Sequence, residues 1–207
     1  MRELRYTLVA EGPSDRALLP ILTWLIQQYT AAAITPALAD LRQLPRPPRS
    51  LSERIAVSLD LFPCDLLFVH RDADRDPRQY RVQEIHAALE ALGDTIPVPV
   101  VPVVPVRMTE AWLLFDVVAI RRAAGNPNGR VPLELPAIHA CEGLVNPKDE
   151  LIKVVRTASG LSVRRQKKLQ VEGVAVRVAD LIDDFSPLSV LSAFRALQDD
   201  VRLLMEE

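Results

Sequence analysis

Apolar and polar positions in the first half of the chain change repeatedly between two patterns. Short runs of aliphatic and β-branched residues, such as residues 6–10 and 65–70, predict buried strands. The segments between such runs carry apolar residues at intervals of three and four, which predict helices. Leu18, Leu22 and Leu25, for example, would lie on one face of a helix.

The alternation of strands and helices continues to about residue 124. Predicted strands cover residues 6–10, 31–41, 65–70 and 96–108. Predicted helices begin at Ser14 or Asp15, at Ser50 or Ser52, after the loop at 71–77, and at Thr109. The segment 96–108 contains four prolines, which cannot donate to a sheet ladder, so it should form an edge or interrupted strand. This order predicts an α/β fold, with about four mainly parallel strands flanked by helices over residues 1–124.

The pattern changes after Gly125. Residues 125–136 hold two glycines, three prolines and two asparagines, which predicts a long loop. Helical patterns follow at 147–159, 164–170, 173–182 and 187–205. Residues 125–207 are therefore expected to form a mainly helical C-terminal extension packed on the sheet domain.

Composition narrows the class of protein. Hydrophobic residues make up 49% of the 207 residues and the formal net charge is −2, which is typical of a globular protein and excludes a disordered chain or a polybasic tail. Near-neutral charge still allows a nucleic-acid substrate, because a local basic face is sufficient. Cys64 and Cys141 lack metal-ligand spacing. Since neither a signal peptide nor a membrane span is recognisable, the expected compartment is the cytoplasm.

The acids after the strand at 65–70 are the main candidates for chemistry. Asp72, Asp74 and Asp76 alternate in the loop that follows this strand, and Glu11 follows the strand at 6–10. Ligands of α/β sheets usually bind at the carboxyl ends of the strands. If the two strands are parallel neighbours, Glu11 and Asp72 lie at the same edge, where carboxylates can bind Mg²⁺. The alternative is a solvated turn whose charges are screened by nearby arginines.

Two segments carry a family resemblance. Residues 11–15 have the pattern Glu-Gly-x-Ser-Asp, and residues 72–76 have the pattern Asp-x-Asp-x-Asp. Together they resemble the two signature motifs of the Toprim superfamily, the catalytic domain shared by topoisomerases, bacterial primases, recombination mediators and nucleases of the overcoming-lysogenization-defect type. The resemblance covers about residues 5–116. Residues 110–114, Glu-Ala-Trp-Leu-Leu, are also similar to a segment of small Toprim-like proteins.

The resemblance implies roles for particular acids. Glu11 would act as general acid/base or as a metal ligand, and Asp72 and Asp74 would bind Mg²⁺ or Mn²⁺. Asp76 matches a third acid that only some branches possess. Pro77 departs from the family, since many relatives have glycine at this position.

Each of the other candidate residues has two interpretations. Glu110 could add a carboxylate to the metal site or be a first-turn helix acid. Lys148 resembles a lysine that some Toprim nucleases place beside the scissile phosphate, but a lysine at a helix start is more often simply solvated. His70 could contact the acidic loop or be a buried structural histidine. The basic run at 164–168 could contact a phosphate backbone or form a solvated helix face.

The expected function is a Mg²⁺-dependent phosphoryl-transfer enzyme, a nuclease that hydrolyses DNA or RNA. None of Tyr6, Tyr29 and Tyr80 is placed as a nucleophile, which disfavours topoisomerase chemistry. The resemblance further implies a setting in phage defence or repair, and a partner ATPase or defence protein.

Three alternatives stay open. The first is a non-catalytic Toprim-like module that binds nucleic acid or protein. The second is an Asp-x-Asp phosphatase, although Arg75 stands where such enzymes have Thr or Val. The third is a nucleotide-sugar transferase, which would leave Glu11 unexplained. The oligomeric state is also open, with the helical extension as a candidate interface.

Overall fold

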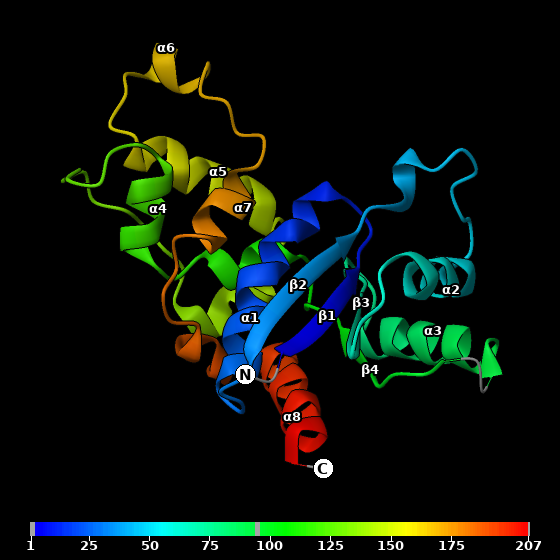
Figure 1. Cartoon of the computed structure of the whole chain (residues 1–207). Coiled ribbons are helices and arrows are strands. Elements are labelled where there is room, and N and C mark those ends of the chain that lie inside the picture. The colour runs from blue at the N-terminus through cyan, green and yellow to red at the C-terminus, as the bar shows by residue number, and fades with distance from the viewer. Residues whose placement is uncertain (1–2, 94–95, 207) are drawn as a thin grey trace.

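The computed structural model describes residues 3–93 and 96–206, and its centre is a four-stranded sheet flanked by helices (Figure 1). The strands are β1 (Glu3–Val9), β2 (Ala33–Ala39), β3 (Leu66–His70) and β4 (Val100–Val103). Their order is β2-β1-β3-β4, and every neighbouring pair is parallel. The predicted α/β fold with a parallel sheet is confirmed.

Strand β3 is buried at all five positions because helices cover both faces of the sheet. Leu66 and Phe68 join one hydrophobic core with α1 (Leu18–Gln27). Leu67 and Val69 point to the opposite face and join a second core, with α2 (Leu51–Leu61) and α3 (Arg78–Glu90). Figure 1 shows α2 and α3 on the side of the sheet away from α1.

Strand β4 lies at an edge of the sheet, as its prolines predict. It extends over only four residues, far fewer than the apolar segment 96–108. Pro102 is tolerated within it because half of the N–H groups of an edge strand have no strand to bind. The valines therefore form a strand only where β3 offers a partner, at Leu67–His70.

The helix starts differ in detail from the sequence expectation. Ser50, not Ser52, caps α2, because its side chain accepts from the N–H of Glu53, whose carboxylate in turn accepts from the N–H of Ser50. Thr109 begins only a 3₁₀ helix, η4 (Thr109–Leu113). The following helix, α4 (Val117–Ala123), is capped by Asp116.

The C-terminal half is helical, as expected, with shorter elements than its pattern suggested. Its helices are α5 (Pro147–Ala158), α6 (Val163–Gln166), α7 (Val174–Ala179) and α8 (Ser192–Glu206), with 3₁₀ segments η5 (Ile138–Gly143) and η6 (Ser186–Val190). A further 3₁₀ turn, η2 (Leu41–Gln43), follows β2. Helix α6 buries no residue, so packing does not stabilise a longer helix over the predicted range 164–170.

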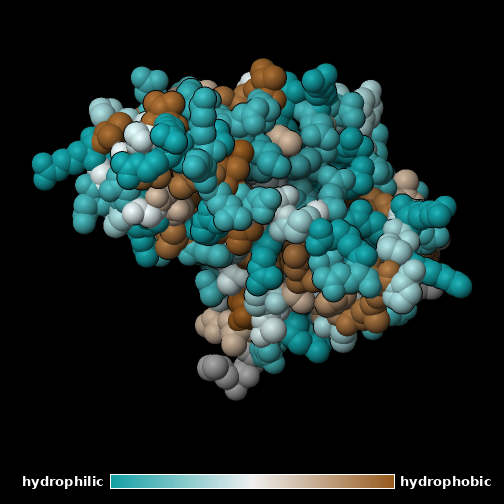
Figure 2. All heavy atoms as spheres, turned by 90° about the horizontal axis from the view of Figure 1, so that it is seen from above, coloured by the Kyte–Doolittle hydropathy of each residue, from teal (hydrophilic) through white to brown (hydrophobic). Residues whose placement is uncertain are grey.

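The helical half and the sheet share a hydrophobic core. Trp112, Val155 and Phe194 belong to the same buried cluster as Leu22 and Phe68. This core includes residues on both sides of residue 124, and the predicted domain boundary at that residue stays a prediction. In Figure 2 the visible face is mainly hydrophilic, with apolar side chains in separate patches. Within the described ranges, no helix has the length and apolarity needed to cross a bilayer.

Candidate metal centre

The carboxyl ends of β1 and β3 bring two acids together. The two strands are parallel neighbours, with Val9 paired to Val69, so the segments that follow them leave the sheet at one edge. At this edge the backbone N–H of Asp72 donates to Oε2 of Glu11 over 3.4 Å. The expectation that these two acids meet is confirmed, although they lie 61 positions apart in the chain.

Asp15 anchors the turn that carries Glu11. Its Oδ2 accepts from the backbone N–H groups of Glu11, at 2.8 Å, and Gly12, at 2.9 Å. Asp15 is buried on the short 3₁₀ helix η1 (Pro13–Ala17), whose N-cap is Gly12. The prediction that Ser14 or Asp15 would be the cap is therefore wrong. Asp15 instead occupies the third position of the turn and reaches back to it, as an acid in a capping box does.

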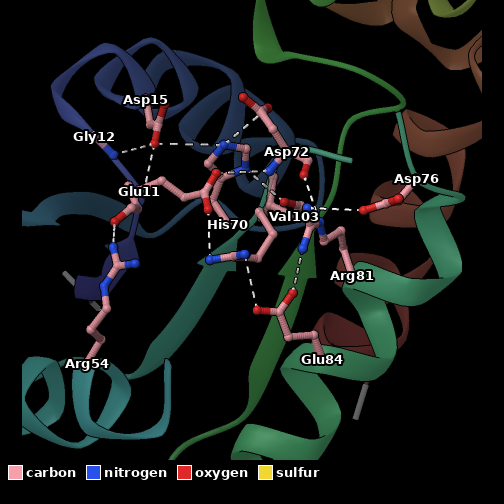
Figure 3. A network of polar contacts seen from close by, with 12 residues as sticks. Glu11, Gly12, Asp15, Arg54, His70, Asp72, Asp76, Arg81, Glu84 and Val103 are labelled. Carbon is pink, nitrogen blue, oxygen red and sulfur yellow. Dashed lines mark hydrogen bonds and ion pairs between the residues drawn. The ribbon is translucent and has the colours of Figure 1, made fainter. Parts of the chain in front are cut away.

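His70, the last residue of β3, points its ring into this edge (Figure 3). The side chain is fully buried, and Nδ1 lies 2.9 Å from the carbonyl oxygen of Val103 on β4. A carbonyl can only accept, so Nδ1 must donate and carries a proton. In the neutral ring Nε2 then has a free lone pair. It lies 3.4 Å from Oδ1 of Asp72 and 3.8 Å from Oδ2 of Asp15.

Two buried polar atoms at this point have no hydrogen-bond partner among the described residues. They are Nε2 of His70 and Oδ1 of Asp72. A lone pair facing carboxylate oxygens is repulsive unless a proton or a cation lies between them. Histidines that bind metals usually donate their other N–H to a carbonyl or carboxylate, as His70 does to Val103.

The ligand set at this edge fits a single cation. Glu11, His70 and Asp72 each place one potential ligand atom within 4.8 Å of the other two. Two carboxylates and an imidazole suit a divalent transition metal such as Mn²⁺, and the carboxylates suit Mg²⁺. The residues present therefore fit a divalent cation of the kind that the sequence predicted, and His70 would be an additional ligand.

The electrostatics of the cluster also favour a positive charge. Burial raises the pKa of Asp72 to about 7, against the opposing effect of His70. The negative charges of Asp15, Glu110 and Glu11 raise it further. A carboxyl group with a pKa this high gains strongly from a nearby cation.

Arginines form ion pairs with the acids on the solvent side of the cluster (Figure 3). Arg71 contacts Glu11 over 2.8 Å and Glu84 over 3.1 Å. Arg81 contacts Glu84 over 3.0 Å and Asp76 over 3.3 Å. This chain of ion pairs fixes Glu11 from the solvent side. It also makes Asp76 a partner of Arg81, and Asp76 is not in the group of three ligand residues.

Asp74 lies outside the cluster that contains Asp72. Its backbone has φ 53°, in the left-handed region, which an Asp tolerates better than most residues. Its N–H donates to the carbonyl of Arg107, and Arg107 Nη1 donates to the Asp74 carbonyl. Asp74 lines a separate hollow of about 420 Å³ with Arg75 and Arg107, and it is not in the ligand group.

Glu110 and Lys148 lie on the helical side of the cluster. Glu110 is 7% exposed, and burial raises its pKa, while the positive charge of Lys148 acts in the opposite direction. Both line one hollow together with Ser14. Glu110 thus adds negative charge to the site without joining the three ligand residues.

The sequence indicates a role for His70 through its position at the end of a predicted strand. A histidine that ends a buried strand directly before an acidic loop lies where ligands of parallel sheets bind.

In comparisons with protein-family models, curated proteins and solved structures, nothing matches this chain significantly. The functional argument therefore depends on the geometry of the site.

Proposed function

We propose that this protein is a metal-dependent phosphoryl-transfer enzyme, a nuclease that hydrolyses phosphodiester bonds in DNA or RNA with Mg²⁺ or Mn²⁺. The observation that carries the proposal is the buried Nε2 of His70 facing Oδ1 of Asp72 without a hydrogen bond to either atom among the described residues. This pair lies beside Glu11 at the carboxyl edge of a parallel sheet.

Each residue of the cluster has a definite part in this proposal. Glu11, His70 and Asp72 would hold the cation, which when bound supplies positive charge to phosphate oxygens and acidifies a water. The Glu11 side chain is 35% exposed, so a water can reach it and transfer a proton to its carboxylate. Arg71 orients that carboxylate from the solvent side. Lys148 offers a positive charge for a phosphate on the helical side of the cluster.

Metal binding is tested by thermal unfolding with and without Mn²⁺. At a hundred times its Kd, Mn²⁺ should stabilise the wild type by about 2.7 kcal/mol, a rise of about 5–10 °C in Tm. Asp72→Ala should lose this rise. His70→Asn should lose it too, although its amide can still donate to the Val103 carbonyl.

Two matched variants serve as controls for that experiment. Asp76→Ala removes an acid that is 54% exposed and paired with Arg81, so the rise should persist. Asp74→Gly, which removes the carboxylate and tolerates the left-handed backbone, should also keep it, whereas the ligand set implied by the Toprim resemblance requires its loss. A rise that survives in Asp72→Ala and His70→Asn would place the metal elsewhere and contradict the proposed centre.

Hydrolysis is tested with end-labelled single- and double-stranded DNA and RNA in the presence of Mn²⁺. Wild type should shorten at least one of these substrates, and Glu11→Ala should lower the rate by about 100-fold or more. Identical products from wild type and Glu11→Ala would exclude the catalytic assignment. Folding of the variant is checked by its circular dichroism.

A non-catalytic binding module is the second candidate, and the arginine network favours it. Arg71 and Arg81 already compensate Glu11, Glu84 and Asp76 without any cation. In this case Mn²⁺ would leave Tm unchanged, no substrate would be cut, and nucleic acid or a protein would still bind.

A further inference from the structure

A hollow of about 600 Å³ opens beside the metal centre on the side of the helical half. Its apolar walls come from α5 and α7, and the residues that form them are Leu151, Ile152, Val174, Ala175 and Val176. The volume lies within the range of small-molecule sites, and the mixture of apolar walls with a few charged groups is typical of them.

Polar residues connect this hollow to the metal centre. Ser14 lines it and directly precedes Asp15, whose carboxylate lies 3.8 Å from Nε2 of His70. Glu110 lines it as well, and its negative charge acts on Asp72. Glu110 and the turn at residues 13–15 therefore link the hollow to the metal centre.

We propose that the hollow binds the base of a nucleotide whose phosphate lies at the Glu11–His70–Asp72 centre. The proposal rests on the proposed function and specifies its substrate. The base is the largely apolar part of a nucleotide, and aliphatic side chains can cover its two faces. Lys148, at the rim, carries the positive charge that a phosphate requires.

The charges of the hollow also determine the orientation of the ligand. Glu110 and Glu172 both line it, so their negative charges disfavour entry of a phosphate. The same carboxylates can accept hydrogen bonds from the amino groups of a base. The base is therefore the end that enters, and the phosphate stays near Lys148 and the metal.

This arrangement restricts the substrate class. A base within a duplex is stacked and paired, and it would have to leave the stack to enter the hollow. An unpaired nucleotide, at a strand end or in a single strand, meets no such cost. The enzyme should thus act on single-stranded nucleic acid in preference to duplex.

The proposal is tested by calorimetric titration of the wild type, with Mn²⁺ present, using adenosine 5′-monophosphate and ribose 5-phosphate as probes. The two differ in the base, so the nucleotide should bind at least about tenfold more tightly, which corresponds to about 1.4 kcal/mol. Ile152→Trp and Val176→Trp fill the hollow and should remove this difference while Mn²⁺ affinity is unchanged. Val163→Trp, at a position that is 70% exposed on α6, should retain it.

The outcomes separate the two proposals. Equal binding of both probes to wild type would overturn the base site, as would tighter binding of n-octyl phosphate than of the nucleotide, because the hollow would then suit an alkyl chain. Unchanged Mn²⁺ affinity in both tryptophan variants shows that they are folded. The titrations are repeated without Mn²⁺. If the nucleotide still binds more tightly than ribose 5-phosphate without Mn²⁺, the hollow binds the base whether or not the protein binds Mn²⁺. A failure of Mn²⁺ to bind would then overturn only the metal centre.

Discussion

At the scale of single residues, Asp72 carries an energetic cost in the folded protein. Its side chain is half-buried beside other acids, and its buried Oδ1 has no hydrogen bond among the described residues. Proteins often accept such a cost where a ligand will later compensate the charge. The same feature that supports metal binding should therefore destabilise the metal-free protein.

The pH dependence of unfolding tests this cost. The pKa of Asp72 is about 7 in the folded protein and about 3.9 in an unfolded chain, so the folded state binds more protons between these pH values. Stability should hence be highest below pH 4 with respect to this group and fall as the pH rises to 7. Asp72→Asn should raise the free energy of unfolding at pH 8 in EDTA by about 1–3 kcal/mol.

Urea denaturation across pH 4–8 provides the measurement. The gain in Asp72→Asn should shrink toward pH 4, where the wild-type carboxyl is protonated in the folded state and about half protonated in the unfolded chain. Asp74→Asn is the matched control, because Asp74 is outside the ligand group and asparagine tolerates its left-handed backbone. A gain in Asp72→Asn that is the same at every pH would show that ionisation of Asp72 is not its cause.

At the scale of elements, the short helix η1 decides where Glu11 points. Glu11 is separated from the end of β1 only by Ala10, and the two N–H groups bound by Asp15 close the turn after that strand. Without this anchor the turn would have two part-buried donors without a protein acceptor. The position of a proposed metal ligand thus depends on a carboxylate four residues further along.

Asp15→Ala should lower both stability and metal affinity. Loss of the acceptor should cost about 1–2 kcal/mol in the free energy of unfolding, measured by urea denaturation. The Kd for Mn²⁺ should rise because Glu11 loses its support. Asp116→Ala is the control: Asp116 caps α4 through the N–H groups of Val118 and Ala119, so its loss should lower stability similarly and leave Mn²⁺ affinity intact. Equal Mn²⁺ affinity in both variants would remove Asp15 from the positioning role.

At the scale of the whole molecule, aromatic contacts join the two halves of the sequence. Phe194 on α8 packs edge-on against Trp112, with ring centroids 5.4 Å apart, and both are fully buried. Phe185 makes similar contacts with Trp24 on α1 and with Phe115. The helical half therefore forms part of the core that supports the sheet.

This shared core predicts a single cooperative unfolding transition. Circular dichroism and tryptophan fluorescence should report the same midpoint in urea. Phe194→Ala should move both together and cost about 3–5 kcal/mol. Leu203→Ala, at a site on α8 that is 59% exposed, should change stability by less than about 0.5 kcal/mol. Two separate transitions would instead support an independent domain beyond residue 124.

Much of the fold was predictable because its signals are local. The runs at 6–10 and 65–70 form strands, and the prolines of 96–108 correctly indicate an edge strand. Helix limits were less predictable, since α6 buries no residue and α7 ends at Ala179 although Ile182 beyond it is still buried in the core.

For this protein, the sequence by itself determined the alternation of strands and helices and the placement of Glu11 and of the loop at 72–76 at the carboxyl ends of two strands. Both follow from periodicity and from the rule that parallel strands share a carboxyl edge. Only the tertiary structure decided which side chains face one another there. His70 enters the cluster because β4 offers the Val103 carbonyl to its ring, and Asp74 is absent from it, in a left-handed turn bonded to Arg107. These choices depend on strand register and on contacts between distant segments, which no local pattern encodes.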